Sequence, residues 1–229
     1  MDNVNYVLYV CTALPFLLAL LIVEGRSRWL MLYLIIGSTV CICVSEINYL
    51  ILTAYGGDFV RVTIMATPIT EEIIKALPVL YYALFISDNR KTLLTISFAT
   101  GVGFAVLENS MILYQNIEEI SLLWAFGRGF GSSLMHGLCT GIIGIGISYV
   151  KKKRKLFAVG TIAMLLMAIT YHSTYNVLVQ SQYRIAGLLL PVITYIPIMV
   201  LMIRHQIVTY NKMIAEHEKR KEKKDDGAS

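Results

Sequence analysis

Long apolar runs restrict the folds open to this sequence more than any other feature. Seven runs of roughly twenty residues carry few charges, and a helix of that length crosses the ~30 Å of hydrocarbon in a bilayer. Hydrophobic residues make up 56% of the chain and charged residues only 15%, against about 25% charged in a soluble domain. We therefore predict an all-α, polytopic transmembrane helical bundle in the cell membrane. The expected spans are residues 5–23, 29–53, 62–86, 92–115, 126–150, 156–179 and 186–203.

Positive charge indicates how these spans are oriented, because cytoplasmic loops are enriched in Lys and Arg. With the N-terminus outside and the C-terminus in the cytoplasm, two cations lie in outside loops, Arg61 and Arg184. Sixteen cations then lie in the cytoplasm: Arg26, Arg28, Arg90, Lys91, Lys151, Lys152, Lys153, Arg154, Lys155, Arg204, Lys212, Lys219, Arg220, Lys221, Lys223 and Lys224. The first run has no Lys or Arg before it, so it lacks the charged start of a secretory signal and is expected to be a span.

We expect one transmembrane domain over residues 1–203 and a basic cytoplasmic tail over 204–229. The tail mixes Glu with Lys, which is typical of a solvated segment near anionic lipid. No aromatic residues interleave its basic run, residues 219–224, so nucleic acid is not an expected partner.

Two of the runs have features that predict local geometry. The third contains Pro68 and Pro78, which must kink or interrupt a helix. The fifth is rich in glycine, and small residues let helices approach closely in lipid. We expect the third span to be irregular and the fifth to lie centrally in the bundle.

Ionisable residues inside the expected spans are candidates for function, because a charge at the bilayer centre costs about 2.5–3.5 kcal/mol on insertion scales. In the third span Lys75 follows Glu71 by four residues and Glu72 by three, within reach of an ion pair with either carboxylate. Successive helical residues point about 100° apart, so Glu71 and Glu72 should not be equivalent. The full set is Glu46, Glu71, Glu72, Lys75, Glu108, Arg128, His136 and His172.

Glu108, His136 and His172 follow on the next three spans. Counting 1.5 Å per residue from the expected span ends places all three at about the depth of Glu71, in the outer half of the bilayer. His172 and Asn176 share a helical face. Each of these residues also has a purely structural interpretation. Glu71, Glu72 and Lys75 can neutralise one another, Glu108 can be a buried hydrogen-bonded carboxyl, and each histidine can be an ordinary core residue. Their recurrence on four successive spans favours one shared site.

These residues resemble the motifs of the PrsW family of intramembrane proteases over roughly residues 65–180. The matching elements are Glu71-Glu72-x-x-Lys75, Gly103-Phe104-x-x-x-Glu108-Asn109, His136 and His172-x-x-x-Asn176. The related CAAX-processing proteases have a longer gap to Arg in the first motif and His in place of Glu108. The resemblance implies that residues 1–203 form a protease domain. It also implies site-1 cleavage of a single-span substrate, an anti-sigma factor, on its extracytoplasmic side.

Peptide hydrolysis needs an activated water, a stabilised oxyanion and a protonated leaving amine. Glu71 or Glu72 can act as the base and acid. Glu108, His136 and His172 can hold a zinc ion with one open position. Alternatively the reaction proceeds without metal and His172 and Asn176 hold the oxyanion. The chain has no HExxH motif, so the sequence leaves both mechanisms open.

A proton-coupled transporter is the alternative function, because buried Glu and His also form proton relays. The absence of an inverted repeat in the sequence argues against that alternative.

Overall fold

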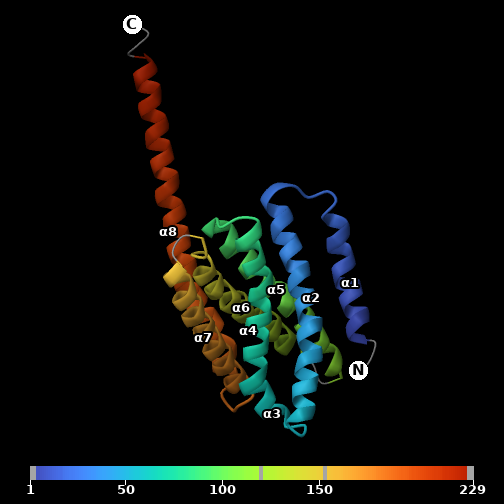
Figure 1. Cartoon of the computed structure of the whole chain (residues 1–229). Coiled ribbons are helices and arrows are strands. Elements are labelled where there is room, and N and C mark those ends of the chain that lie inside the picture. Colours follow the sequence, from blue (N-terminus) through green and yellow to red (C-terminus); the bar gives the residue numbers. More distant parts are fainter. Residues whose placement is uncertain (1–3, 119–120, 152–153, 226–229) are drawn as a thin grey trace. The chain divides into compact units, whose positions relative to one another are not determined.

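A computed structural model describes residues 4–118, 121–151 and 154–225 of the chain. Over those residues the chain is helical and contains no β-strand, which confirms the predicted all-α fold. The elements (Figure 1) are α1 Val4–Ala19, α2 Gly25–Ala54, α3 Phe59–Arg61, the π-helical segment η1 Val62–Ala66, α4 Thr67–Phe85, α5 Arg90–Gln115, α6 Leu122–Ile147, α7 Arg154–Val179 and α8 Arg184–Asp225.

The chain divides into two compact units, residues 1–191 and 192–229, and the first contains the helical bundle. The expected tail, 204–229, continues as helix α8 to Asp225, and residues 226–229 lie outside the described residues. Its cytoplasmic location stays a prediction.

Within the described residues, four helices are long and apolar enough to cross a membrane: Ser27–Ala54, Arg90–Gln115, Leu122–Ile147 and Phe157–Val179. They correspond to the second, fourth, fifth and sixth expected spans. Val4–Ala19 and Arg184–Val200 are shorter apolar helices, and the third expected span is broken and carries Glu71, Glu72 and Lys75. The count of seven spans and the orientation of the termini stay predictions.

The third expected span is irregular, as its prolines predicted. Asp58 caps α3 by accepting a hydrogen bond from the Arg61 main-chain N–H at 3.0 Å. The π-helical turn of η1 then leads into α4, where Pro68 lies at the start of the helix and Pro78 lies inside it. A proline at the first turn is tolerated because that turn's N–H groups have no helical acceptor.

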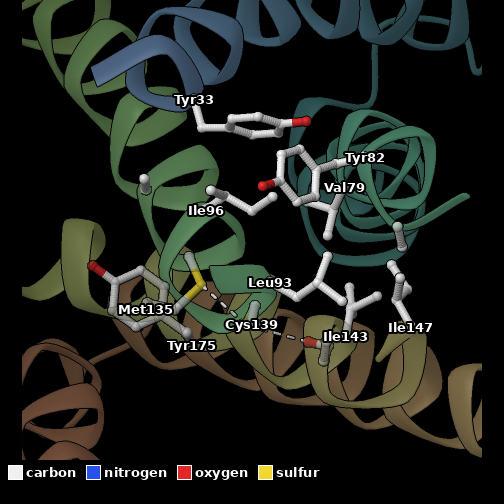
Figure 2. Packing of buried hydrophobic residues seen from close by; sticks show 13 residues of the cluster. Tyr33, Val79, Tyr82, Leu93, Ile96, Met135, Cys139, Ile143, Ile147 and Tyr175 are labelled. Carbon is white, nitrogen blue, oxygen red and sulfur yellow. Dashed lines mark hydrogen bonds between the residues drawn. The ribbon is translucent and has the colours of Figure 1, made fainter. Parts of the chain in front are cut away.

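An apolar core lies between α2, α4, α5, α6 and α7 (Figure 2). The Tyr82 ring of α4 makes edge-on contacts with Trp29 and Tyr33 of α2, at centroid distances of 5.0 and 5.8 Å. The Tyr33 hydroxyl donates to the Pro78 carbonyl at 3.0 Å. The buried members are Tyr33, Val79, Tyr82, Ala83, Leu93, Ile96, Ala99, Met135, Cys139, Ile143, Ile147, Ala168 and Tyr175.

Two glycines of α5 allow the helix backbones to approach closely. A Cβ on Gly101 would overlap the His136 carbonyl of α6, and one on Gly103 would overlap Leu34 of α2. The most apolar windows of α5 and α6 are 61% and 67% buried, against 11% for that of α7. The predicted central position of the fifth span is therefore confirmed for α6, and α5 shares it.

Candidate active site

The first turns of α4 bury three charged side chains, Glu71, Glu72 and Lys75, each at most 2% exposed. The Lys75 ammonium donates to Glu72 Oε1 at 2.6 Å and to Glu71 Oε2 at 3.4 Å. It also lies 4.4 Å from the centre of the Phe104 ring on α5, a cation–π distance. The predicted pairing of Lys75 with the carboxylates is therefore present, and the trio is fully desolvated.

His136 of α6 lies against this trio and links it to α5. Its Nδ1 is 2.9 Å from Lys75 Nζ, and its Nε2 is 3.0 Å from Glu108 Oε2. An ammonium can only donate, so we assign Nδ1 as the acceptor and Nε2–H as the donor to Glu108. The carboxylate of Glu108 thus fixes the orientation of the imidazole.

His172 of α7 completes the group from the other side. Its Nδ1 donates to Glu72 Oε1 at 2.9 Å, which leaves the Nε2 lone pair free, 3.9 Å from Glu71 Oε2. The two imidazole rings meet edge to face at 4.9 Å. One potential ligand atom from each of Glu71, Glu72, His136 and His172 lies within 4.8 Å of the others. We call these four residues the carboxylate–histidine group.

Glu71 and Glu72 are held differently, as the helical geometry predicted. Glu72 Oε1 has two short contacts, with Lys75 and His172, whereas the distances from Glu71 Oε2 to its three nearest nitrogens are 3.4–3.9 Å. Lys75 therefore fixes Glu72 and leaves Glu71 with more freedom to contact another molecule.

Glu108 and Arg128 form the partly open edge of the site. Arg128 of α6 lies 3.6 Å from Glu108 Oε2, and the two side chains are 19% and 20% exposed. The side chains of Lys75 and of the four residues in the carboxylate–histidine group are at most 3% exposed. Glu108 and Arg128 are therefore the most accessible polar side chains in contact with the group, and a molecule that approaches it from this edge contacts them first.

Asn176 shares the face of His172 but is engaged elsewhere. Its Nδ2 donates to the Thr63 carbonyl in η1 at 3.0 Å. This bond fastens α7 to the irregular turn before α4 and so helps to position Glu71 and Glu72. The oxyanion role predicted for Asn176 stays a prediction, and this contact does not require it.

The structure also separates one residue from the predicted set of ionisable groups. Glu46 accepts a hydrogen bond from the Tyr6 hydroxyl at 2.6 Å on the exposed side of α2, outside the carboxylate–histidine group. Arg128 is a site residue with no role predicted from the sequence. The signal that could have found it is an arginine within an expected span, two helical turns before His136.

The residues present fit a bound metal ion. Two imidazoles and two carboxylates are the nitrogen and oxygen ligands that zinc accepts, and Glu72 Oε2 is buried with no hydrogen-bond partner among the described residues. In formal charge, with both histidines neutral, the site has one more carboxylate than cations. The carboxylates are Glu71, Glu72 and Glu108, and the cations are Lys75 and Arg128.

The group differs from the ligand set predicted from the sequence, Glu108, His136 and His172. Glu71 and Glu72 lie close to both imidazoles. Glu108 instead contacts Nε2 of His136, the ring nitrogen that does not contact Lys75. Lys75 donates to His136 Nδ1, the lone pair that a metal ion would use, so the Lys75–His136 hydrogen bond and a metal–Nδ1 bond exclude one another.

Comparison with known proteins identifies the same region. A family model described as PrsW family intramembrane metalloprotease matches residues 25–202. That match contains every residue of the carboxylate–histidine group, together with Lys75, Glu108 and Arg128. No curated protein and no solved structure matches the chain.

Proposed function

Because the chain belongs to the PrsW family of intramembrane metalloproteases, we propose that it hydrolyses a peptide bond of a single-span membrane protein, near the extracytoplasmic face of the cell membrane. The observation that supports this proposal best is the burial of two carboxylates and two imidazoles within 4.8 Å of one another, on three different helices. Ionisable groups are costly to bury in a membrane protein, so such groups usually mark a functional site.

We assign the members of the site different tasks. Glu72, His136 and His172 would hold the metal ion, with zinc the best match to their ligand atoms. Glu71, the less constrained carboxylate, accepts the proton of the attacking water and later returns it to the leaving amine. Glu108 orients His136, and Lys75 orients Glu72. A metal ion bound there would supply a Lewis acid that makes the attacking water easier to deprotonate.

The substrate class follows from the family and from the expected topology. A site in the outer half of the bilayer would meet the extracytoplasmic end of a substrate's membrane span. An anti-sigma factor is the substrate that the family resemblance implies, and cleavage there would be the first of two cuts. The basic cytoplasmic segments would contact anionic lipid.

Topology tests that substrate class. We expect a multi-pass protein with seven spans and a cytoplasmic C-terminus. A phosphatase that is active only outside the cytoplasm should therefore be inactive when fused after Ser229, and a cytoplasmic reporter fused there should be active. The reverse pattern would contradict both the seven-span count and the proposed depth of the site.

The decisive experiment is cleavage of single-span reporter peptides by the purified protein in liposomes. Glu71→Gln should lower the rate by about 10²–10⁴-fold, the usual contribution of acid–base catalysis. Glu72→Gln should also lower the rate, because it replaces a proposed metal ligand. Glu46→Gln is the matched control, because Glu46 is a glutamate of another span that lies outside the group. It should cleave at the normal rate.

Metal dependence is measured on the same preparation. A chelator should abolish cleavage, zinc should restore it, and metal analysis should find less bound zinc in His172→Ala than in the unaltered protein. Full activity in both Gln variants at normal protein level would contradict the assignment. Proton-coupled uptake by the liposomes without peptide cleavage would favour the transporter, which the family match does not support.

A further inference from the structure

Buried hydrogen-bond donors with no acceptor within the described residues include Arg128 Nε, Ser132 Oγ and the Tyr175 hydroxyl, on the two helices that carry His136 and His172. Buried polar groups are nearly always hydrogen-bonded, and leaving one unpaired costs stability. Donors without acceptors are expected where a substrate will supply the acceptor.

The three donors face one region. On α6, Arg128 and Ser132 precede His136 by eight and four residues, so they follow one helical stripe. On α7, Tyr175 follows His172 by three residues, also on a shared face.

Figure 2 shows how Tyr175 lies. Its ring is beside Met135, and its hydroxyl points away from Cys139, Ile143 and Ile147, the residues that follow His136 along α6. Tyr175 is only 2% exposed. The ring is therefore held by packing on the apolar core, and the hydroxyl points away from the C-terminal half of α6.

Three polar side chains of the site, His136, His172 and Asn176, already have partners for their donors. His172 Nδ1 donates to Glu72, His136 Nε2 donates to Glu108, and Asn176 Nδ2 donates to Thr63. Hydrolysis nevertheless requires a donor for the carbonyl oxygen. As water adds to the carbonyl carbon, the π electrons of the C=O bond move to that oxygen. The C–N bond then breaks, the amine takes a proton, and the products are a carboxylate and an amine.

We propose that Arg128 and Tyr175 bind the carbonyl oxygen of the scissile peptide bond and stabilise the negative charge that develops on it. Arg128 reaches this position from the partly open edge and offers Nε–H, while one of its terminal nitrogens stays near Glu108. Tyr175 offers its O–H from the packed side. Donors aimed at a developing oxyanion in a water-poor site are among the largest contributions to catalysis. This inference rests on the proposed protease function.

Tyr175→Phe tests the proposal, because it removes one hydroxyl and keeps the ring in the core. We expect kcat on the single-span reporter to fall by about 10²-fold, the usual effect of removing one oxyanion donor, while KM changes less than about 3-fold. Zinc content should be unchanged, and the melting temperature should be equal or higher, since an unpaired buried hydroxyl is lost. Tyr33→Phe is the matched control, because its hydroxyl is bonded to Pro78, and its kcat should be normal.

Arg128→Lys gives an independent measurement if Tyr175→Phe is poorly folded. It keeps a positive charge beside Glu108 but removes the Nε–H donor, and kcat should fall with zinc content intact. A normal kcat in folded Tyr175→Phe would overturn the proposal, provided that Glu72→Gln is inactive in the same assay. Where Tyr175→Phe does not fold, a normal kcat in Arg128→Lys would overturn it under the same condition. The protease assignment would stand in either case. Equal cleavage by Glu72→Gln and the unaltered protein would overturn both.

Discussion

The helices α4, α5, α6 and α7 build two buried clusters of opposite character within a few turns of one another. One is the apolar core, which contains Val79, Leu93, Cys139 and Ala168. The other is the polar site, whose members on α4, α6 and α7 precede or follow these residues by one or two turns. An apolar core tolerates substitutions that keep its volume. A buried polar network is stable only while every member keeps its partners. The two clusters should therefore respond very differently to mutation.

Lys75→Met should produce the largest difference. Removing one partner of a buried ion pair typically costs about 3–5 kcal/mol, because it leaves an uncompensated charge. Here the carboxylates of Glu71 and Glu72 would lose their shared cation. We expect the metal-free variant to melt at a much lower temperature than the unaltered protein.

Added zinc should raise the melting temperature of Lys75→Met more than that of the unaltered protein, because Lys75 no longer occupies the His136 Nδ1 lone pair. Thermal unfolding with and without zinc measures both effects. Ile143→Val, a small change in the apolar core, is the comparison and should show the ordinary zinc-dependent shift. Loss of zinc binding in Lys75→Met would show that Lys75 supports the metal site and does not compete for it.

Gly101→Ala tests the packing that both clusters share. The new methyl group would overlap the His136 carbonyl, a main-chain atom that cannot rotate away. Overpacking typically costs about 1–3 kcal/mol, and separating α5 from α6 would also lengthen the contact between Glu108 and His136. We expect lower stability and loss of cleavage together, measured by thermal unfolding and by the reporter assay.

Gly141→Ala on α6 is the matched control, because a Cβ there meets no atom within 4 Å. It should be equal to or slightly more stable than the unaltered protein, since alanine favours helix. If Gly101→Ala unfolds at the normal temperature and cleaves normally, the close approach of α5 and α6 is not needed to hold His136.

Sequence reasoning predicted the helices, the broken third span and the residues that meet. Those features follow from apolar length, from proline chemistry and from the cost of facing Glu108, His136 or His172 to lipid. The pairing of Lys75 with the carboxylates was predicted, but the individual partners of His136 and His172 were not. Helix rotation and side-chain rotamers decide which carboxylate contacts Lys75 and His172, and these depend on packing at glycines such as Gly101.

The contact of Asn176 with Thr63 was equally beyond the sequence. The spacing between His172 and Asn176 gives a shared face, but the acceptor is a carbonyl of the π-helical turn, which tertiary structure creates. The metal set predicted from the sequence, Glu108, His136 and His172, stays a prediction. Glu71 and Glu72 were assigned to proton transfer because a buried carboxylate is a competent base and acid, and only the three-dimensional arrangement places them within 4.8 Å of both histidines.

Tyr33→Phe should have the smallest effect and defines where the polar site ends. Its hydroxyl donates to the Pro78 carbonyl, and a hydrogen bond of this kind contributes about 0.5–1.5 kcal/mol. Pro78 lies on α4 only three residues after Lys75, so the bond joins the apolar core to the helix that carries Glu71 and Glu72. Thermal unfolding should show a loss of about 1 kcal/mol, while cleavage per folded molecule stays within about 2-fold, because the ring contact with Tyr82 remains. A large loss of cleavage at nearly normal stability would mean that Pro78 transmits the position of α4 to its carboxylates, and the two clusters would then be one functional unit.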